Sequence, residues 1–130
     1  MKNLFYILAA TFILVACTSA TAEEKAAEAA KDYYDRLVEG YPEGFLEGKA
    51  GIGHQPGDYC EQLLATYKKY LEDVKKKHGG IREVMVSPHV GRSDTTLQVT
   101  YAFLLLCYED STQEEIIVPM VQVANEWRMK

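Results

Sequence analysis

The chain has 130 residues, with 14 lysines and arginines against 19 aspartates and glutamates, and carries a net charge of −5. An acidic chain without a basic stripe binds nucleic acid poorly, so we expect no nucleic-acid partner. A hydrophobic fraction of 48%, with nine tyrosines, excludes a largely disordered chain.

The first sixteen residues have the layout of a secretion signal. Lys2 precedes an apolar or weakly polar run, Leu4 to Ala16, of 13 residues. As a helix this run would extend about 20 Å, too short to cross a hydrocarbon core of roughly 30 Å. The run ends in a small alanine directly before Cys17, which resembles a bacterial lipoprotein signal in which the cysteine is lipidated. The alternative is an ordinary secretory signal cut after Ala20 or Ala22.

The lipoprotein resemblance implies both an anchor and a location. Residues 1–16 would be removed, residues 17–22 would be the lipidated cysteine and a tether, and residues 23–130 would form a single domain. The mature chain of 114 residues would hold 13 basic and 19 acidic side chains, a net charge of −6. Thr18 stands where an aspartate would favour the inner membrane. The resemblance therefore implies an outer-membrane lipoprotein whose domain faces the periplasm.

Two helices and a glycine-rich loop are predicted in the first half of the domain. Apolar residues recur at spacings of three and four over residues 23–39, and Gly40 ends this helix. Residues 42–47 could add one turn that docks Phe45 inward. Residues 48–57 contain four glycines and a proline, which predicts a loop. A second long helix follows over residues 58–78, where Asp58 and Glu61 match a capping box.

From residue 81 the apolar period changes to two, which predicts strands. We expect strands over residues 81–89, 95–109, 114–123 and 127–130, with turns at 91–94, 110–112 and 124–126. Pro119 within the third strand indicates an edge position or a bulge. Helices followed by consecutive hairpins predict an α+β fold, with N-terminal helices packed on a curved four-stranded antiparallel sheet.

Several segments, taken in order, resemble a family of small bacterial lipoproteins with a nuclear-transport-factor-2-like, or cystatin-like, domain. The segments are residues 29–31, 37–40, 75–81, 118–121 and 126–129, together with Phe45. The family usually has a glycine in the last turn, where this chain has Asn125 and Glu126. Such lipoproteins are sometimes labelled lumazine-binding-like or lipocalin-like. The resemblance implies a cone formed by the sheet and the helices, and this fold hosts both enzymes and binding proteins.

The mouth of such a cone is a natural pocket for a small apolar ligand. Tyrosines supply a flat apolar body and one hydroxyl, so five of them are candidates to line it. They are Tyr33, Tyr34, Tyr67, Tyr70 and Tyr101. The alternative reading makes them ordinary core tyrosines whose hydroxyl groups reach solvent.

We predict no catalytic residue, metal site or cofactor. The long strand carries no carboxylate that could act as a buried base, and the three histidines do not have the spacing of metal ligands. With Cys17 used for lipidation, Cys60 and Cys107 are left as a candidate disulfide in an oxidising compartment, or as free, buried thiols. The alternative function is a small-molecule enzyme or carrier that uses the tyrosine-lined cone.

The second face of the long strand becomes apolar toward its end, which suggests a surface that needs a cover. The candidate interface residues are Leu104, Leu106, Tyr108, Ile116, Val118 and Met120. The partner would be a second copy of the chain or another envelope protein. The alternative is that the fold covers this patch internally.

Overall fold

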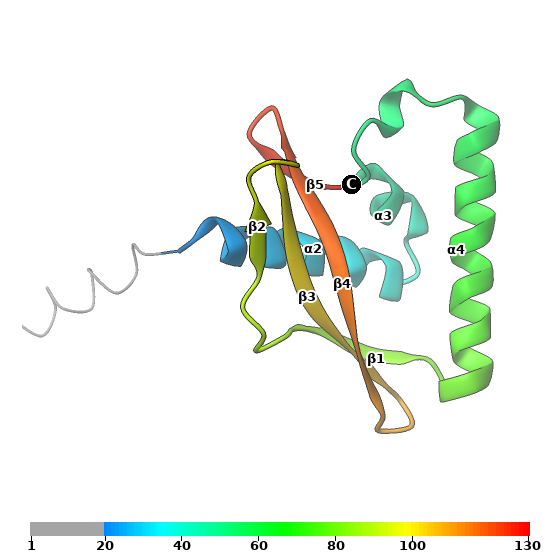
Figure 1. Cartoon of the computed structure of the whole chain (residues 1–130). Coiled ribbons are helices and arrows are strands. Elements are labelled where there is room, and N and C mark those ends of the chain that lie inside the picture. Colours follow the sequence, from blue (N-terminus) through cyan, green and yellow to red (C-terminus); the bar gives the residue numbers. More distant parts are fainter. Residues whose placement is uncertain (1–19) are drawn as a thin grey trace, which may run out of the picture.

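The computed structural model describes residues 20–130, so the predicted signal peptide and Cys17 lie outside the described residues. The elements are helices α2 (Ala22–Val38), α3 (Pro42–Glu47), η1 (Ile52–His54) and α4 (Gly57–His78), followed by strands β1 (Ile81–Val86), β2 (Arg92–Asp94), β3 (Val99–Tyr108), β4 (Gln113–Val123) and β5 (Glu126–Met129) (Figure 1). Helices followed by a curved antiparallel sheet confirm the predicted α+β class.

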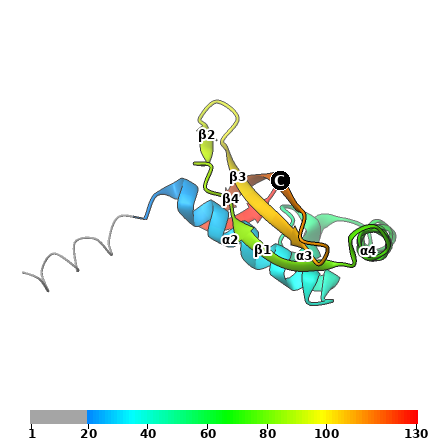
Figure 2. The same cartoon turned by 90° about the horizontal axis from the view of Figure 1, so that it is seen from below.

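Helix α2 packs across one face of the sheet (Figure 2). Thr21 caps its N-terminus, where the hydroxyl oxygen accepts a hydrogen bond from the Glu24 amide at 3.2 Å. Two small residues on its buried side, Ala26 and Ala30, are fully buried. Leu37, near the end of the helix, is almost fully buried as well. Alanines let the helix axis approach the strands closely, which places α2 at the centre of the core.

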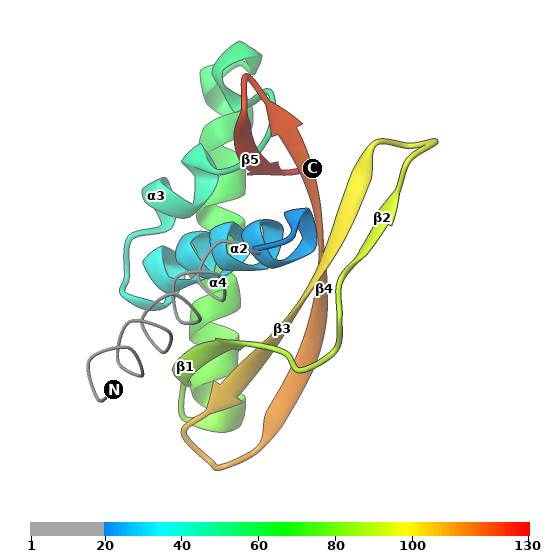
Figure 3. The same ribbon diagram turned by 90° about the vertical axis from the view of Figure 1, so that its left-hand side faces the viewer.

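Helix α4 stands beside the sheet, next to α3 (Figure 1 and Figure 3). It contacts β1, and His78 at its C-terminal end stacks on Tyr108 of β3. The expected capping box does not form, because extended Pro56 is the N-cap and Asp58 already lies in the first turn. Gly79 ends the helix in the left-handed conformation, as predicted. Only Val74 of this helix is buried, so most of its apolar side is half covered.

The strand order is β1-β3-β4-β5, and β2 pairs with the first part of β3. The short strand β2 replaces the predicted turn at residues 91–94, and the reversal comes later, at residues 95–98. The Asp94 carboxylate accepts hydrogen bonds from the amides of Thr96 and Leu97, both at 3.0 Å, and Gln98 has a positive φ of 55°. The Asp94 side chain thus fixes the turn, and β3 begins at Val99 rather than at residue 95.

The core lies on the face of the sheet that the sequence suggested as an interface. Leu104, Leu106, Tyr108, Val118 and Met120 are all at most 4% exposed, and Ile116 packs against the same cluster. Helix α2 covers most of these residues, and His78 of α4 covers Tyr108. The interface prediction is therefore wrong for this set, because side chains buried under a helix cannot meet a partner.

A polar clip joins the end of α4 to the β3–β4 turn. The His78 ring stacks on Tyr108 with 4.1 Å between ring centroids, and its Nδ1 lies 2.7 Å from the Asp110 carboxylate. Hydrogen bonds from Thr112, the largest cause, and from His78 lower the pKa of Asp110 to about 2. The clip holds the C-terminal end of the long helix against the sheet.

This clip predicts an acid-sensitive contribution to stability. A depressed carboxyl pKa stabilises the fold above the ordinary value of 3.8, and this contribution is lost as the pH falls toward 2. We expect Asp110→Asn to flatten the decline of unfolding free energy between about pH 4 and 2, measured by urea titration. Asp73→Asn, an exposed change on α4, is the matched control. A decline of unchanged steepness in Asp110→Asn would contradict the prediction.

Candidate functional site

An apolar cleft lies where α2, α3, α4 and the last two strands meet. Its volume is about 200 Å³. The lining consists of aromatic and aliphatic side chains with two lysines: Tyr34, Phe45, Lys49, Tyr67, Ile117, Val118, Pro119, Met129 and Lys130. The cleft therefore draws on five separate parts of the chain.

Three aromatic rings form one wall of the cleft. The ring of Phe45 contacts Tyr34 and Tyr67, each edge to face with centroids 4.9 Å apart. Pro42 begins helix α3 and orders the short turn that carries Phe45 inward. Edge-to-face pairs add about 0.5–1.5 kcal/mol beyond the area they bury, so this wall is held in shape before any ligand arrives.

The tyrosines of this wall are held in the neutral form. Burial, as the largest cause, and the nearby Tyr70 and Tyr67 together raise the pKa of Tyr34 to about 12. Burial also raises the pKa of Tyr67. At neutral pH both phenols therefore offer a hydrogen-bond donor, and neither can act as a base.

The opposite rim carries positive charge. Lys49 forms a parallel bridge with Met129, supported by 2.7 Å hydrogen bonds from the Ala50 amide to the Met129 carbonyl and from the Met129 amide to the Gly48 carbonyl. A Cβ on Gly48 would lie 2.5 Å from the Tyr33 ring, so this close approach requires glycine. Among the described residues, neither Lys49 nor Lys130 has a carboxylate within 4.0 Å. Both ammonium groups are available to an anion.

The β4 side of the cleft is a free sheet edge. Strand β5 pairs with Met120 to Val123 only, and the Lys130 amide donates to the Pro119 carbonyl at 2.9 Å. Pro119 thus occupies the edge position that the sequence predicted. Ile117 is 59% exposed on this edge. The cleft is therefore open along one side.

One solved structure resembles this architecture. It is a protein from Campylobacter jejuni named as a proposed NTF2-like transpeptidase, with a TM-score of 0.61 and 9% identity over 78% of this chain and 94% of that one. The fold is NTF2-like. No family model matches the sequence. No curated protein matches it either.

Within the NTF2-like fold, two of the five candidate tyrosines line the cleft, Tyr34 and Tyr67. Tyr33 instead donates a hydrogen bond to the Trp127 carbonyl at 2.7 Å and stacks under Arg36. Tyr70 lies beside Tyr108 and Glu114 near the other end of α4. Tyr101 pairs with Pro119 on the face of the sheet that α2 does not cover.

The lysines and the β4 edge were not predicted as parts of the cleft. Phe45 was expected to dock inward, and its position is confirmed. Pro119 was the available signal for the edge, because proline within a strand indicates a position without a neighbour on its amide side. No local pattern marks Lys49, which reaches the cleft only through its bridge to Met129.

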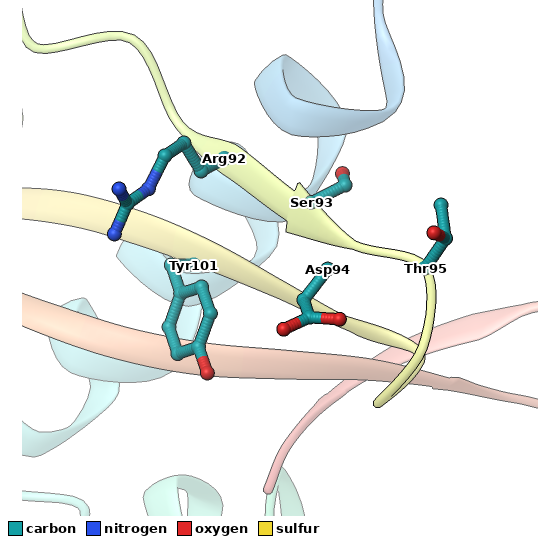
Figure 4. Close-up of a pocket in the computed structure, with 5 residues that line it drawn as sticks. All are labelled: Arg92, Ser93, Asp94, Thr95 and Tyr101. Carbon is teal, nitrogen blue, oxygen red and sulfur yellow. The ribbon is translucent and has the colours of Figure 1, made fainter.

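Two wider hollows flank the β2–β3 hairpin. One of about 500 Å³ is lined by Arg92, Ser93, Asp94, Thr95 and Tyr101 (Figure 4). The other, of about 580 Å³, lies between the start of α2, the hairpin and Trp127. Both are open; the first is lined largely by polar groups, and the second by polar and apolar groups in about equal measure. Neither has the enclosing apolar walls that hold a small ligand.

Both cysteines within residues 20–130 are free thiols, so the candidate disulfide between Cys60 and Cys107 is not formed. Cys60 lies in the first turn of α4, whereas Cys107 lies at the end of β3. The Glu109 amide bonds to the Gly80 carbonyl, which places the end of β3 beside the far end of α4. About 28 Å of helix therefore separates the two thiols.

The remaining polar cluster has no catalytic arrangement. Glu115 accepts hydrogen bonds from Ser87 Oγ at 2.6 Å and from His89 Nδ1 at 2.8 Å. In a nucleophilic triad the serine hydroxyl forms a hydrogen bond with the histidine ring. Here the serine hydroxyl and the histidine ring both bond to the carboxylate instead. Within residues 20–130, no three histidine, cysteine, aspartate or glutamate side chains gather as metal ligands. Over the same range, no helix is long and apolar enough to cross a bilayer.

Proposed function

We propose that this protein is a non-catalytic, lipid-anchored protein of the cell envelope that binds a small anionic amphiphile in the Tyr34–Phe45–Tyr67 cleft. The single observation that carries the ligand class is an aromatic cleft with two unpaired lysines on its rim. Cys17, as the proposed lipidation site, would hold the domain at the outer membrane facing the periplasm. The lipoprotein resemblance of residues 1–17 supports this location.

The size of the cleft limits the apolar part of the ligand. At about 200 Å³ it is smaller than the roughly 300–1,000 Å³ of sites for drug-sized molecules. One aromatic ring or a short acyl segment fits such a volume. The Tyr34 and Tyr67 hydroxyls add neutral donors, and Lys49 and Lys130 add charge at the mouth. A carboxylate attached to a ring or a short chain meets these requirements.

A binding role is favoured over an enzymatic one by the chemistry of the cleft. Its tyrosines stay protonated, its charged side chains are ammonium ions, and no aspartate, glutamate, histidine or cysteine side chain lines it. The Campylobacter jejuni neighbour is named for a transpeptidase activity, which needs a nucleophile or an activating partner. Cys107 is fully buried, and Cys60 is not a cleft residue.

Amide chemical-shift perturbation with phenylacetate and phenylethanol tests this proposal. The two probes share a carbon skeleton, and only phenylacetate is anionic. We expect phenylacetate to bind at the cleft with a dissociation constant of about 1 mM, and phenylethanol several-fold more weakly.

Lys49→Gln should reduce the preference for phenylacetate, Lys49→Gln combined with Lys130→Gln should bring the two probes to equal affinity, and Tyr67→Ala should weaken both. Lys68→Gln changes a lysine on the exposed side of α4 and should alter neither affinity. Shifts that map outside the cleft, or equal binding of both probes to the unaltered protein, would refute an anionic ligand at this site.

A further inference from the structure

Strand β4 has a free edge over its first half. Strand β5 pairs with Met120 to Val123 only, and within residues 20–130 no other main chain pairs with the outer side of residues 113–118. This stretch spans about 17 Å. Glu115 and Ile117 on it are exposed, so solvent reaches the edge. Figure 1 shows α4 beyond this edge, on the side of β4 away from β3.

The main-chain groups of this edge point outward at alternate residues. The Lys130 amide donates to the Pro119 carbonyl, so the main chain at Pro119 faces away from β3. The register with β3 runs without a bulge over residues 113–120. Alternation in an antiparallel ladder therefore turns the N–H and C=O groups of Ile117 and Glu115 outward as well. Main-chain groups without a partner along a sheet edge are the template on which an extended peptide adds as a strand.

The apolar cleft lies at one end of this free edge. Ile117 and Val118 line the cleft from β4, and Tyr67 lines it from α4. In a strand that adds parallel to β4, the residue whose amide bonds to the Ile117 carbonyl has its side chain on the same face as Val118. Phe45 and the core lie on that face. A cleft of about 200 Å³ there accommodates one apolar side chain of the added strand.

An added strand cannot continue past the cleft. Lys130 already occupies the edge position beside Pro119, so a peptide on the edge ends there or turns away. Lys49 and Lys130 lie at this point, and among the described residues neither has a carboxylate side chain within 4.0 Å. A chain end that carries negative charge complements two ammonium groups, and in a peptide this end is the C-terminal carboxylate.

We propose that the cleft and the β4 edge together bind the free C-terminus of an extended peptide whose last residue is apolar. The peptide runs parallel to β4, bonds through its main chain to Ile117 and Glu115, and places its carboxylate beside the two lysines. Only main-chain groups of Glu115 take part, because its carboxylate is bonded to Ser87 and His89. This inference rests on the proposed function, since the cleft is the same, and it identifies the anionic amphiphile as the end of a peptide.

Amide chemical-shift titration of the protein with the pentapeptide acetyl-Ser-Thr-Val-Thr-Phe tests this assignment, with phenylacetate as the reference. We expect the peptide with a free carboxylate to bind at least about tenfold more tightly than phenylacetate, because only the peptide bonds to the edge. The same peptide with a C-terminal amide should bind at least about tenfold more weakly than the acid. The Ile117 amide signal should shift with the peptide and much less with phenylacetate.

N-methylation of the peptide tests the strand pairing without altering the protein. The N–H of the valine, third from the end, points at the Glu115 carbonyl in the parallel arrangement, so N-methyl-valine should weaken binding at least about tenfold. The N–H of the following threonine points away from β4. N-methylation of that threonine is therefore the matched control, and it should leave the affinity within about twofold of the unmodified peptide.

The outcomes separate this inference from the proposed function. Binding of phenylacetate at the cleft, with a peptide acid that binds no more tightly, would overturn the peptide and leave the small anionic ligand. Equal losses for the two N-methyl peptides would overturn the strand pairing, and equal affinities of acid and amide would overturn the terminal carboxylate. Binding of neither phenylacetate nor the peptide would overturn both proposals.

Discussion

Replacing Leu104 by alanine is expected to lower the free energy of unfolding by about 3 kcal/mol. Leu104 is fully buried on β3 under α2, in the same cluster as Ala30 and Met120. The change removes apolar contacts and leaves a cavity that a close-packed helix and sheet cannot fill. Denaturant titration measures the loss as a lower midpoint at an unchanged slope.

The matched control is Leu97→Ala, which deletes the same atoms from a side chain that is 57% exposed. We expect it to change stability by less than about 0.5 kcal/mol. Equal losses for the two variants would contradict the assignment of the Leu104 face as the core.

Replacing Cys17 by alanine in the full-length chain is expected to move the protein from the membrane to the soluble fraction. Each CH₂ group of an acyl chain that is buried in the bilayer contributes about 0.8 kcal/mol to membrane binding, so several chains anchor a protein stably. Alanine cannot carry acyl chains, so the substitution removes the whole of this binding energy. Fractionation of cells followed by immunoblotting measures the change.

Cys60→Ala controls for the loss of a cysteine as such, because Cys60 lies in α4 within the described domain. We expect Cys60→Ala to leave the membrane fraction unchanged. Continued membrane association of Cys17→Ala would refute lipidation at this position, and it would leave the ligand proposal for the cleft untouched.

Most of the fold could be predicted from local patterns. The 3.6-residue period and Gly40 gave α2 to within one residue at either end, and Gly79 marked the end of α4. The turn at residues 91–94 was misplaced because the deciding contact is a side-chain cap by Asp94 within the chain's own hairpin. Gly91 looked like the turn residue, although it only lets the chain approach the Tyr101 carbonyl.

The choice of the buried face of β3 could not be predicted, because both faces are apolar. Alternation tells which residues share a face, and the residues of the predicted interface set, such as Leu104, Ile116 and Val118, do share one. Which set meets α2 depends on tertiary packing. For the same reason the grouping of the candidate tyrosines could not be predicted. Tyr34 and Tyr67 meet in the cleft, whereas Tyr101 lies on the opposite face of the sheet. Lys49 needed the bridge to β5, a contact over 80 residues of sequence.

The position of the Thr21 cap has a consequence for the range of action of this protein. Four residue steps separate Cys17 from Thr21, and a fully extended chain covers at most about 14 Å over that distance. With the proposed acyl chains at Cys17, the folded domain would stay within about this distance of the bilayer surface. It would diffuse laterally along the membrane, encounter other copies of itself in two dimensions, and bind only those ligands that reach the membrane surface.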